Sequence, residues 1–152
     1  MAGLLCIAKT DEIALVAATA KTVLQIEAPA NQRLKIKSWG IFFDGISGVE
    51  PAVEVVLMRQ TVGSSEWTGT VACKIQSPAG VSETVQTVGD YNATAEPTTG
   101  DIVDMIESHP QSGYEKLIPF DMPIDVPGAG LLGIVCTAPA VVNVRAKIIF
   151  EE

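Results

Sequence analysis

Hydrophobic and polar residues alternate along most of the chain, and the alternation is clearest near its end. One side of the segment 142–150 is entirely apolar, with Val142, Val144, Ala146, Ile148 and Phe150. The other side carries Asn143, Arg145 and Lys147, and the large apolar Ile149 is its exception. A period of two residues is typical of a half-buried β-strand, so the pattern predicts a final strand. We expect this strand to pair with one near the N-terminus.

Further apolar segments, separated by turn residues, predict the other strands. They cover residues 12–18, 22–28, 32–43, 52–59, 70–75, 101–107, 114–120, 123–126 and 131–137. In 32–43 the phase slips near Ser38-Trp39-Gly40, which predicts a bulge or a bend. The segment 52–59 is apolar on both faces, which predicts a central strand. No segment has a convincing helical period. The chain therefore predicts one all-β domain over residues 1–152, an antiparallel, jelly-roll-like β-sandwich of about eight to ten strands.

The region 77–97 breaks this pattern because it is rich in Thr, Ser, Gly and Asn. Its apolar residues show little periodicity. A loop of this length in a compact domain usually belongs to a functional or interface surface. We expect a long surface loop here, after a polar turn at 61–67.

The composition indicates the cellular compartment in which the chain folds. No apolar run is long enough to cross a bilayer, and residues 1–8 are too short and lack the basic start of a signal peptide. The three cysteines, Cys6, Cys73 and Cys136, lie far apart in apolar surroundings. We expect them to be buried and reduced, which fits folding in a reducing cytoplasm. No membrane partner is expected.

The charge argues against nucleic acid as a partner. Ten basic and eighteen acidic residues give a net charge of −8, and an acidic domain repels phosphates. Arg33, Lys35 and Lys37 alternate with Leu34 and Ile36. We expect these three cations on the exposed or partner-facing side of one strand.

Residue types that carry catalysis do not form a recognisable set. His109 precedes Pro110 in a predicted turn, away from any nucleophile motif, and a single histidine excludes a site with several histidine ligands. Along a strand, Asp101 and Glu107 would face one side and Asp104 the other, so the three predict a solvated acidic rim. A carboxylate pair from different strands stays open. We expect no enzyme, and no catalytic, metal or cofactor site.

The two tryptophans have different expected roles. Trp39 lies in an apolar strand and is expected in the core. Trp67 follows the polar turn Gly63-Ser64-Ser65-Glu66 and is a candidate exposed interaction residue. An exposed tryptophan can stack on a sugar, so a carbohydrate-binding β-sandwich is one alternative.

The apolar start of the chain, residues 3–8, would be costly to leave in water. It has three possible fates: a strand of its own sheet, a strand given to a neighbour, or an arm laid on a partner. Leu4, Leu5 and Ile7 are its large apolar residues. We take residues 1–8 as a possible N-terminal arm and these three as candidate capsid or inter-subunit contacts.

Five stretches carry a resemblance to a known group of proteins. They are Thr19–Gln25, Lys37–Gly45, Thr94–Gly100, His109–Glu115 and the closing strand into Glu151-Glu152. In this order they resemble small structural proteins encoded among the virion genes of tailed bacteriophages, most closely a head decoration, or cement, protein.

This resemblance implies a non-enzymatic function. Decoration proteins are β-rich and often trimeric, so it implies a homotrimer bound to the major capsid protein. The protein would fold in the host cytoplasm and then bind the outer capsid surface, where it would stabilise the mature head by mass action and multivalency. A tail, baseplate or fibre-base module with the same fold is the main alternative. A jelly-roll enzyme is the remaining class.

Overall fold

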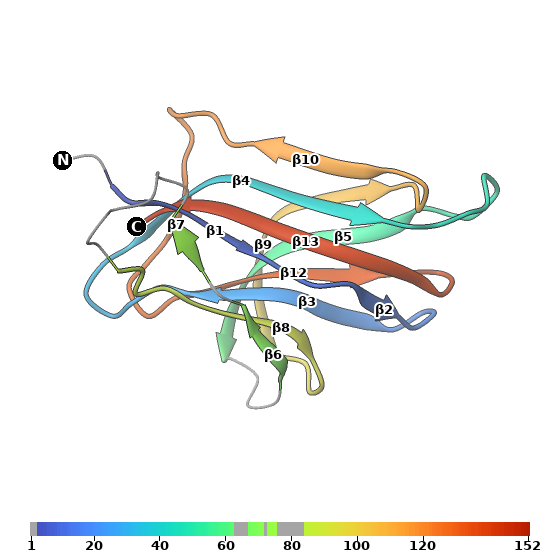
Figure 1. The fold of residues 1–152 in the computed structure, drawn as a ribbon, viewed down its shortest axis with the longest axis horizontal. Coiled ribbons are helices and arrows are strands. Elements are labelled where there is room, and N and C mark those ends of the chain that lie inside the picture. The colour runs from blue at the N-terminus through green and yellow to red at the C-terminus, as the bar shows by residue number, and fades with distance from the viewer. Residues whose placement is uncertain (1–2, 63–66, 72, 76–83) are drawn as a thin grey trace.

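Two antiparallel β-sheets pack face to face in the computed structural model (Figure 1). The structure describes residues 3–62, 67–71, 73–75 and 84–152. Within these ranges there are thirteen strands and no helix, and hence no helix that could cross a membrane. The predicted all-β sandwich is confirmed. Residues 63–66 of the predicted turn and 77–83 of the predicted loop lie outside the described part.

Sheet A has the order β10-β4-β13-β1-β7. The short strands β11 and β2 extend it along β4 and β13. Its strands are β1 (Leu5–Lys9), β2 (Ile13–Leu15), β4 (Leu34–Phe43), β7 (Lys74–Ile75), β10 (Gly113–Leu117), β11 (Ile124–Val126) and β13 (Val142–Glu151). The final strand β13 pairs with β1 and β2, as expected from the sequence.

Sheet B has the order β6-β8-β3-β12-β5-β9. Its strands are β3 (Ala20–Glu27), β5 (Val53–Val62), β6 (Trp67–Val71), β8 (Val88–Ala93), β9 (Thr98–Ser108) and β12 (Leu131–Thr137). Eight consecutive pairs of these strands lie in different sheets: β2 and β3, β3 and β4, β4 and β5, β6 and β7, β7 and β8, β9 and β10, β11 and β12, and β12 and β13. Such crossings give the jelly-roll-like winding.

The core lies between the inner faces of the sheets. The apolar side of β13 is buried and its polar side is not, as the alternation predicts. Sheet B contributes Leu132, Ile134 and Cys136 from β12 and further aliphatic side chains from β5. Trp39 is fully buried in this core, as expected.

The predicted irregularity in β4 is a β-bulge. On β13, Ile149 faces Ser38 while the next residue, Phe150, faces Ile36, so Lys37 is the extra residue. A bulge lets two residues an odd number of positions apart face the same side. Ile36 and Trp39 therefore both enter the core.

Some strands differ from the sequence prediction. β8 forms within the region predicted as a loop. It has no apolar periodicity of its own, and its pairing with β3 and β6 makes it a strand. The short strands β2 and β11 lie within the predicted segments 12–18 and 123–126, and the single predicted segment 70–75 covers the end of β6 and all of β7. β5 is central, as predicted, and its outward-facing Val56 and Met58 form a small second cluster with Val135.

Candidate interaction face

The outer face of sheet A collects most of the basic residues of this acidic protein. Arg145 and Lys147 alternate with the buried residues of β13, so they point outward. Lys9 lies opposite Lys147, and Lys35 lies opposite Glu151. The face contains six of the ten basic residues: Lys9, Lys35, Lys37, Lys74, Arg145 and Lys147. We call these six the basic face.

Three of the six cations are paired with acids on the same face. Lys37 contacts Glu151 at 2.5 Å, Lys147 contacts Glu115 at 2.8 Å, and Arg145 contacts Glu12 at 3.4 Å. Among the described residues, no acid forms an ion pair with the other three cations, Lys9, Lys35 and Lys74. The basic face therefore has an excess of positive charge, although the whole chain carries −8.

The Lys37–Glu151 pair also fixes the start of the chain. The Lys37 ammonium, and after it the backbone N–H of Gly3, which donates to Glu151 Oε1 over 3.0 Å, hold the pKa of the Glu151 carboxyl below its ordinary value. Glu151 is therefore ionised at neutral pH and joins β4, β13 and the residues before β1.

An apolar patch lies within the basic face. Ile7 of β1 lies directly opposite Ile149 of β13. Leu5, two residues before Ile7, lies on the same side of β1. We call Leu5, Ile7 and Ile149 the apolar patch. The patch explains why Ile149 is the one large apolar residue on the polar side of the final strand, because Ile149 packs beside an apolar neighbour, Ile7. Phe42 is a fourth apolar residue on this face and is exposed, with the Lys147 ammonium 5.5 Å from its ring centroid.

The N-terminal segment takes the first of its three possible fates. Residues 5–9 form β1 within the protein's own sheet, with Cys6 and Ala8 fully buried. Leu4 packs against the core, and its backbone exchanges hydrogen bonds of 2.8 and 2.9 Å with Glu152. Of the candidate contact residues, Leu5 and Ile7 thus lie on the outer face and Leu4 does not.

Trp67 lies elsewhere. It begins β6 in sheet B, opposite Ala93, and is half-buried. It is therefore not part of the basic face and presents only part of its ring to solvent.

The carboxylates near residue 104 lie in different surroundings. Asp104 turns toward the sandwich interior, where it accepts a hydrogen bond from the Trp39 indole N–H over 3.1 Å and pairs with Lys116 at 2.9 Å. The hydrogen bond to Asp104 raises the pKa of Lys116. Asp101 and Glu107 are exposed. Asp104 therefore has a structural role.

His109 also has structural contacts. Its Nδ1 accepts the backbone N–H of Gln111 over 3.2 Å, and its carbonyl accepts that of Ser112 over 2.9 Å. These bonds close the turn between β9 and β10, as the sequence predicts.

The cysteines are poor nucleophiles. All three are free, with Cys6 and Cys136 buried and Cys73 half-buried. Burial raises the pKa of Cys6 to about 11 and that of Cys73 to about 12, and it raises the pKa of Cys136 as well. Because the thiolate is the reactive form, burial disfavours reaction of these thiols at neutral pH.

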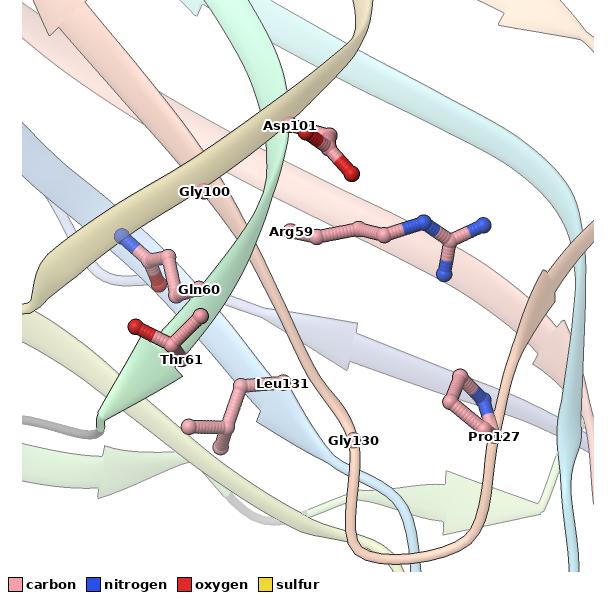
Figure 2. Close-up of a pocket in the computed structure, with 8 residues that line it drawn as sticks. All are labelled: Arg59, Gln60, Thr61, Gly100, Asp101, Pro127, Gly130 and Leu131. Atoms are coloured by element: carbon pink, nitrogen blue, oxygen red, sulfur yellow. The ribbon is translucent and has the colours of Figure 1, made fainter.

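A pocket of about 290 Å³ lies beside β5 and β9 (Figure 2). Arg59 and Asp101 extend into it, and the guanidinium donates to the backbone oxygen of Asp125 over 2.8 Å. Gln60, which also lines it, is bonded to Gln25 and Thr22. The pocket thus offers one cation and one carboxylate, which can orient a polar group but do not make a nucleophile and its base.

The described residues contain no cluster of His, Cys, Asp and Glu suited to a metal ion. Comparison of the chain with protein families, curated proteins and solved structures found no match. The sequence predicted Lys35 and Lys37 of this face on the exposed side of one strand, but the other four cations come from three further strands that only the sheet register brings together.

Proposed function

We propose that this protein is a non-enzymatic virion structural protein of a tailed bacteriophage, which binds the outer surface of the capsid and stabilises the mature head. The observation that supports this most is the basic face with its central apolar patch. A surface that combines unpaired cations with clustered large apolar groups suits a protein partner. The sequence resemblance to decoration proteins points the same way.

The apolar patch would supply part of the binding free energy. Fully burying a side chain of the size of Leu or Ile contributes about 1.5–3 kcal/mol. Leu5, Ile7 and Ile149 are already partly covered, so each would contribute less. Many copies bound to one shell multiply this modest contribution. A protein that binds only the mature lattice also shifts the equilibrium of that lattice away from disassembly.

The basic face would select an acidic partner. Lys9 and Lys74 form no ion pair within the described residues, so their charge is available to steer association. The partner we propose is an acidic region on the exterior of the major capsid protein. Because the decoration proteins that the sequence resembles are often trimeric, we propose a homotrimer as the bound form.

Co-sedimentation with mature capsids that lack the protein tests the proposal. The double variant Ile7→Thr and Ile149→Thr keeps two β-branched residues on the outer face, so the sheet should persist while the patch loses apolar area. We expect its affinity to fall about tenfold or more. The matched control is Ile102→Thr with Met105→Thr, two exposed residues of β9 in sheet B, and it should bind like wild type.

Salt dependence tests the charge. Binding should weaken as salt rises, and Lys9→Gln should reduce that dependence. Ala95→Glu changes the net charge equally in an exposed segment next to sheet B and should leave the salt dependence unchanged. No sedimentation of wild-type protein with capsids would reject the function, and the tail-module alternative would take its place.

A further inference from the structure

The cavity of about 290 Å³ in Figure 2 lies apart from the surface proposed to bind the capsid. It opens beside the end of β5 and the start of β9, and none of the six cations of the basic face lines it. Pro127, Gly130 and Leu131, from the turn into β12, form its other wall. Cavities of roughly 300 Å³ and more hold small molecules in proteins. This one is therefore a candidate binding site that capsid binding does not use.

Irregular pairing between β5 and β9 brings two charged side chains into this cavity. Between the β9 partners of Met58 and Gln60 lie two residues, whereas β5 has only one in that interval. The two are Gly100 and Asp101, and they form a β-bulge, a feature that turns side chains in new directions and recurs beside functional sites. A Cβ at Gly100 would lie 2.8 Å from the Arg59 carbonyl oxygen, so the close approach of the strands requires glycine. Asp101 thereby enters the same cavity as Arg59.

Arg59 is held in place but keeps most of its hydrogen-bonding capacity. Its guanidinium donates to the backbone oxygen of Asp125 over 2.8 Å, which fixes the position of the charged group. A guanidinium carries several N–H donors in a planar fork, so the others remain available. Within the described part of the chain, no acid forms an ion pair with Arg59. Arg59 therefore presents a fixed cation with free donors to the cavity.

Asp101 supplies acceptors to the same space. Its side chain is exposed, and among the described residues it forms neither an ion pair nor a hydrogen bond. Because Arg59 and Asp101 do not pair with each other, a ligand group between them can accept from the guanidinium and donate to the carboxylate. Hydrogen bonds to ionised groups are about twice as strong as those between neutral groups. The two side chains therefore suit a ligand that both donates and accepts.

A second cavity, of about 390 Å³, adjoins the first and shares Arg59 and Pro127 with it. It adds Arg33 and Asp125, whose side chains pair at 3.5 Å. Among the described lining residues, the joined cavities thus have two cations and two carboxylates, and their charges balance. A charged ligand would be attracted by one kind of group and repelled by the other. The balance favours a neutral ligand with many hydrogen-bonding groups.

The apolar wall of the first cavity is preformed. The N–H of Gly130 donates to Pro127 O over 2.8 Å, and the N–H of Ala28 donates to Gly130 O over 2.9 Å. The ring of Pro127 also fixes its own backbone φ. Pro127 and Leu131 therefore present aliphatic surface in one arrangement, and a preformed site loses less free energy to ordering when a ligand binds.

We infer that the joined cavities bind a carbohydrate, as a mono- or disaccharide unit. A sugar is neutral, and each of its hydroxyl groups can donate to the Asp101 carboxylate or accept from the Arg59 guanidinium. Its C–H groups can cover the aliphatic wall of Pro127 and Leu131, so apolar burial and hydrogen bonding act together. Trp67, which the sequence suggested for stacking on a sugar, lines neither cavity. Carbohydrate binding is an activity additional to capsid binding.

Saturation-transfer NMR on the full chain tests the site. The probes are the methyl glycosides of glucose, galactose, mannose and N-acetylglucosamine, together with maltose and cellobiose. Wild-type protein should transfer saturation to at least one of these sugars, and a titration gives its dissociation constant. Asp101→Ala and Arg59→Met should each weaken binding of that sugar about tenfold or more, because each removes a charged hydrogen-bonding partner. Glu107→Ala removes another exposed carboxylate of β9, outside both cavities, and should bind like wild type.

Three results would overturn the inference. They are no transfer to any of these sugars, equal affinity of wild type and the Asp101→Ala variant, and binding of the zwitterion glycylglycine in the absence of sugar binding. Asp101 is exposed, so its variant should stay folded and decides the test even if Arg59→Met lowers the thermal midpoint. Capsid binding by the Asp101→Ala variant should equal that of wild type, because neither cavity includes the basic face or the apolar patch. The two proposals can therefore fail independently.

Discussion

The indole N–H of Trp39 donates to Asp104 Oδ2 over 3.1 Å and thereby joins β4 of sheet A to β9 of sheet B. Lys116 of β10 approaches the same carboxylate at 2.9 Å. A fully buried indole needs an acceptor, since an unpaired buried donor is destabilising. The acid that the sequence grouped with a solvated rim is thus a link between the two sheets.

Replacing Asp104 should destabilise the fold more than replacing its neighbour Asp101. Asp104→Ala leaves the Trp39 N–H unpaired and should cost about 1–3 kcal/mol of unfolding free energy. Asp104→Asn keeps an acceptor but loses the charge facing Lys116, so its loss should be smaller. Urea unfolding measures both. Asp101→Ala, an exposed residue on the same strand, is the control, and an equal loss there would contradict the assigned role.

Acid should weaken the protein partly through Glu151. Lys37 lowers the pKa of this carboxyl in the folded state, so the folded protein binds the proton less readily than the unfolded chain. The stabilisation is complete above the unfolded pKa, about 4.3 for a free glutamate, and is lost as the pH falls through the folded value. Glu151→Gln should therefore show a shallower loss of stability on acidification than wild type. Parallel acid titrations of the two proteins would disprove this role.

Alkali should weaken the protein through its thiols. In the unfolded chain a cysteine thiol has a pKa of about 8.5, whereas burial raises the pKa of Cys73 in the folded protein to about 12. The unfolded state then loses protons first, so stability should decline as the pH rises from about 9. Cys73→Ala should flatten this decline in denaturant titrations. Adding reductant at neutral pH should leave the thermal midpoint unchanged, because all three thiols are free.

Deleting residues 2–8 should harm the fold itself. Most of β1 would be lost, including its pairing with β13 and the fully buried Cys6 and Ala8. We expect a loss of about 3 kcal/mol or more of unfolding free energy. Ile7→Thr changes only the outer face and should cost no more than about 1 kcal/mol. Equal thermal stability of the deletion and wild type would show that β1 is an independent arm.

The fold was largely predictable because apolar periodicity reports burial. The alternation in 142–150 located both β13 and its buried side, and the phase slip in β4 located the bulge at Lys37. β8 was not predictable, since Gly89, Asp90 and Asn92 give it no apolar period and pairing with its neighbours determines it.

The candidate site was only partly predictable. Leu5 and Ile7 stood out because they are apolar near the chain start, and the structure places both on the outer face. Ile149 was noticed as an exception, but its partner Ile7 lies far away in sequence. Lys9 and Lys74 gave no signal, because only the register of β1 with β13 and β7 brings them to one face.

The temperature at which capsids release their DNA tests the central claim most directly. Mature capsids lacking the protein are heated alone, with wild-type protein, or with the Ile7→Thr, Ile149→Thr variant. Wild type should raise the release temperature, because a ligand that binds only the intact shell stabilises it by mass action, and the variant should raise it less at equal concentration. A release temperature that saturating wild-type protein leaves unchanged would contradict the proposed stabilisation of the head.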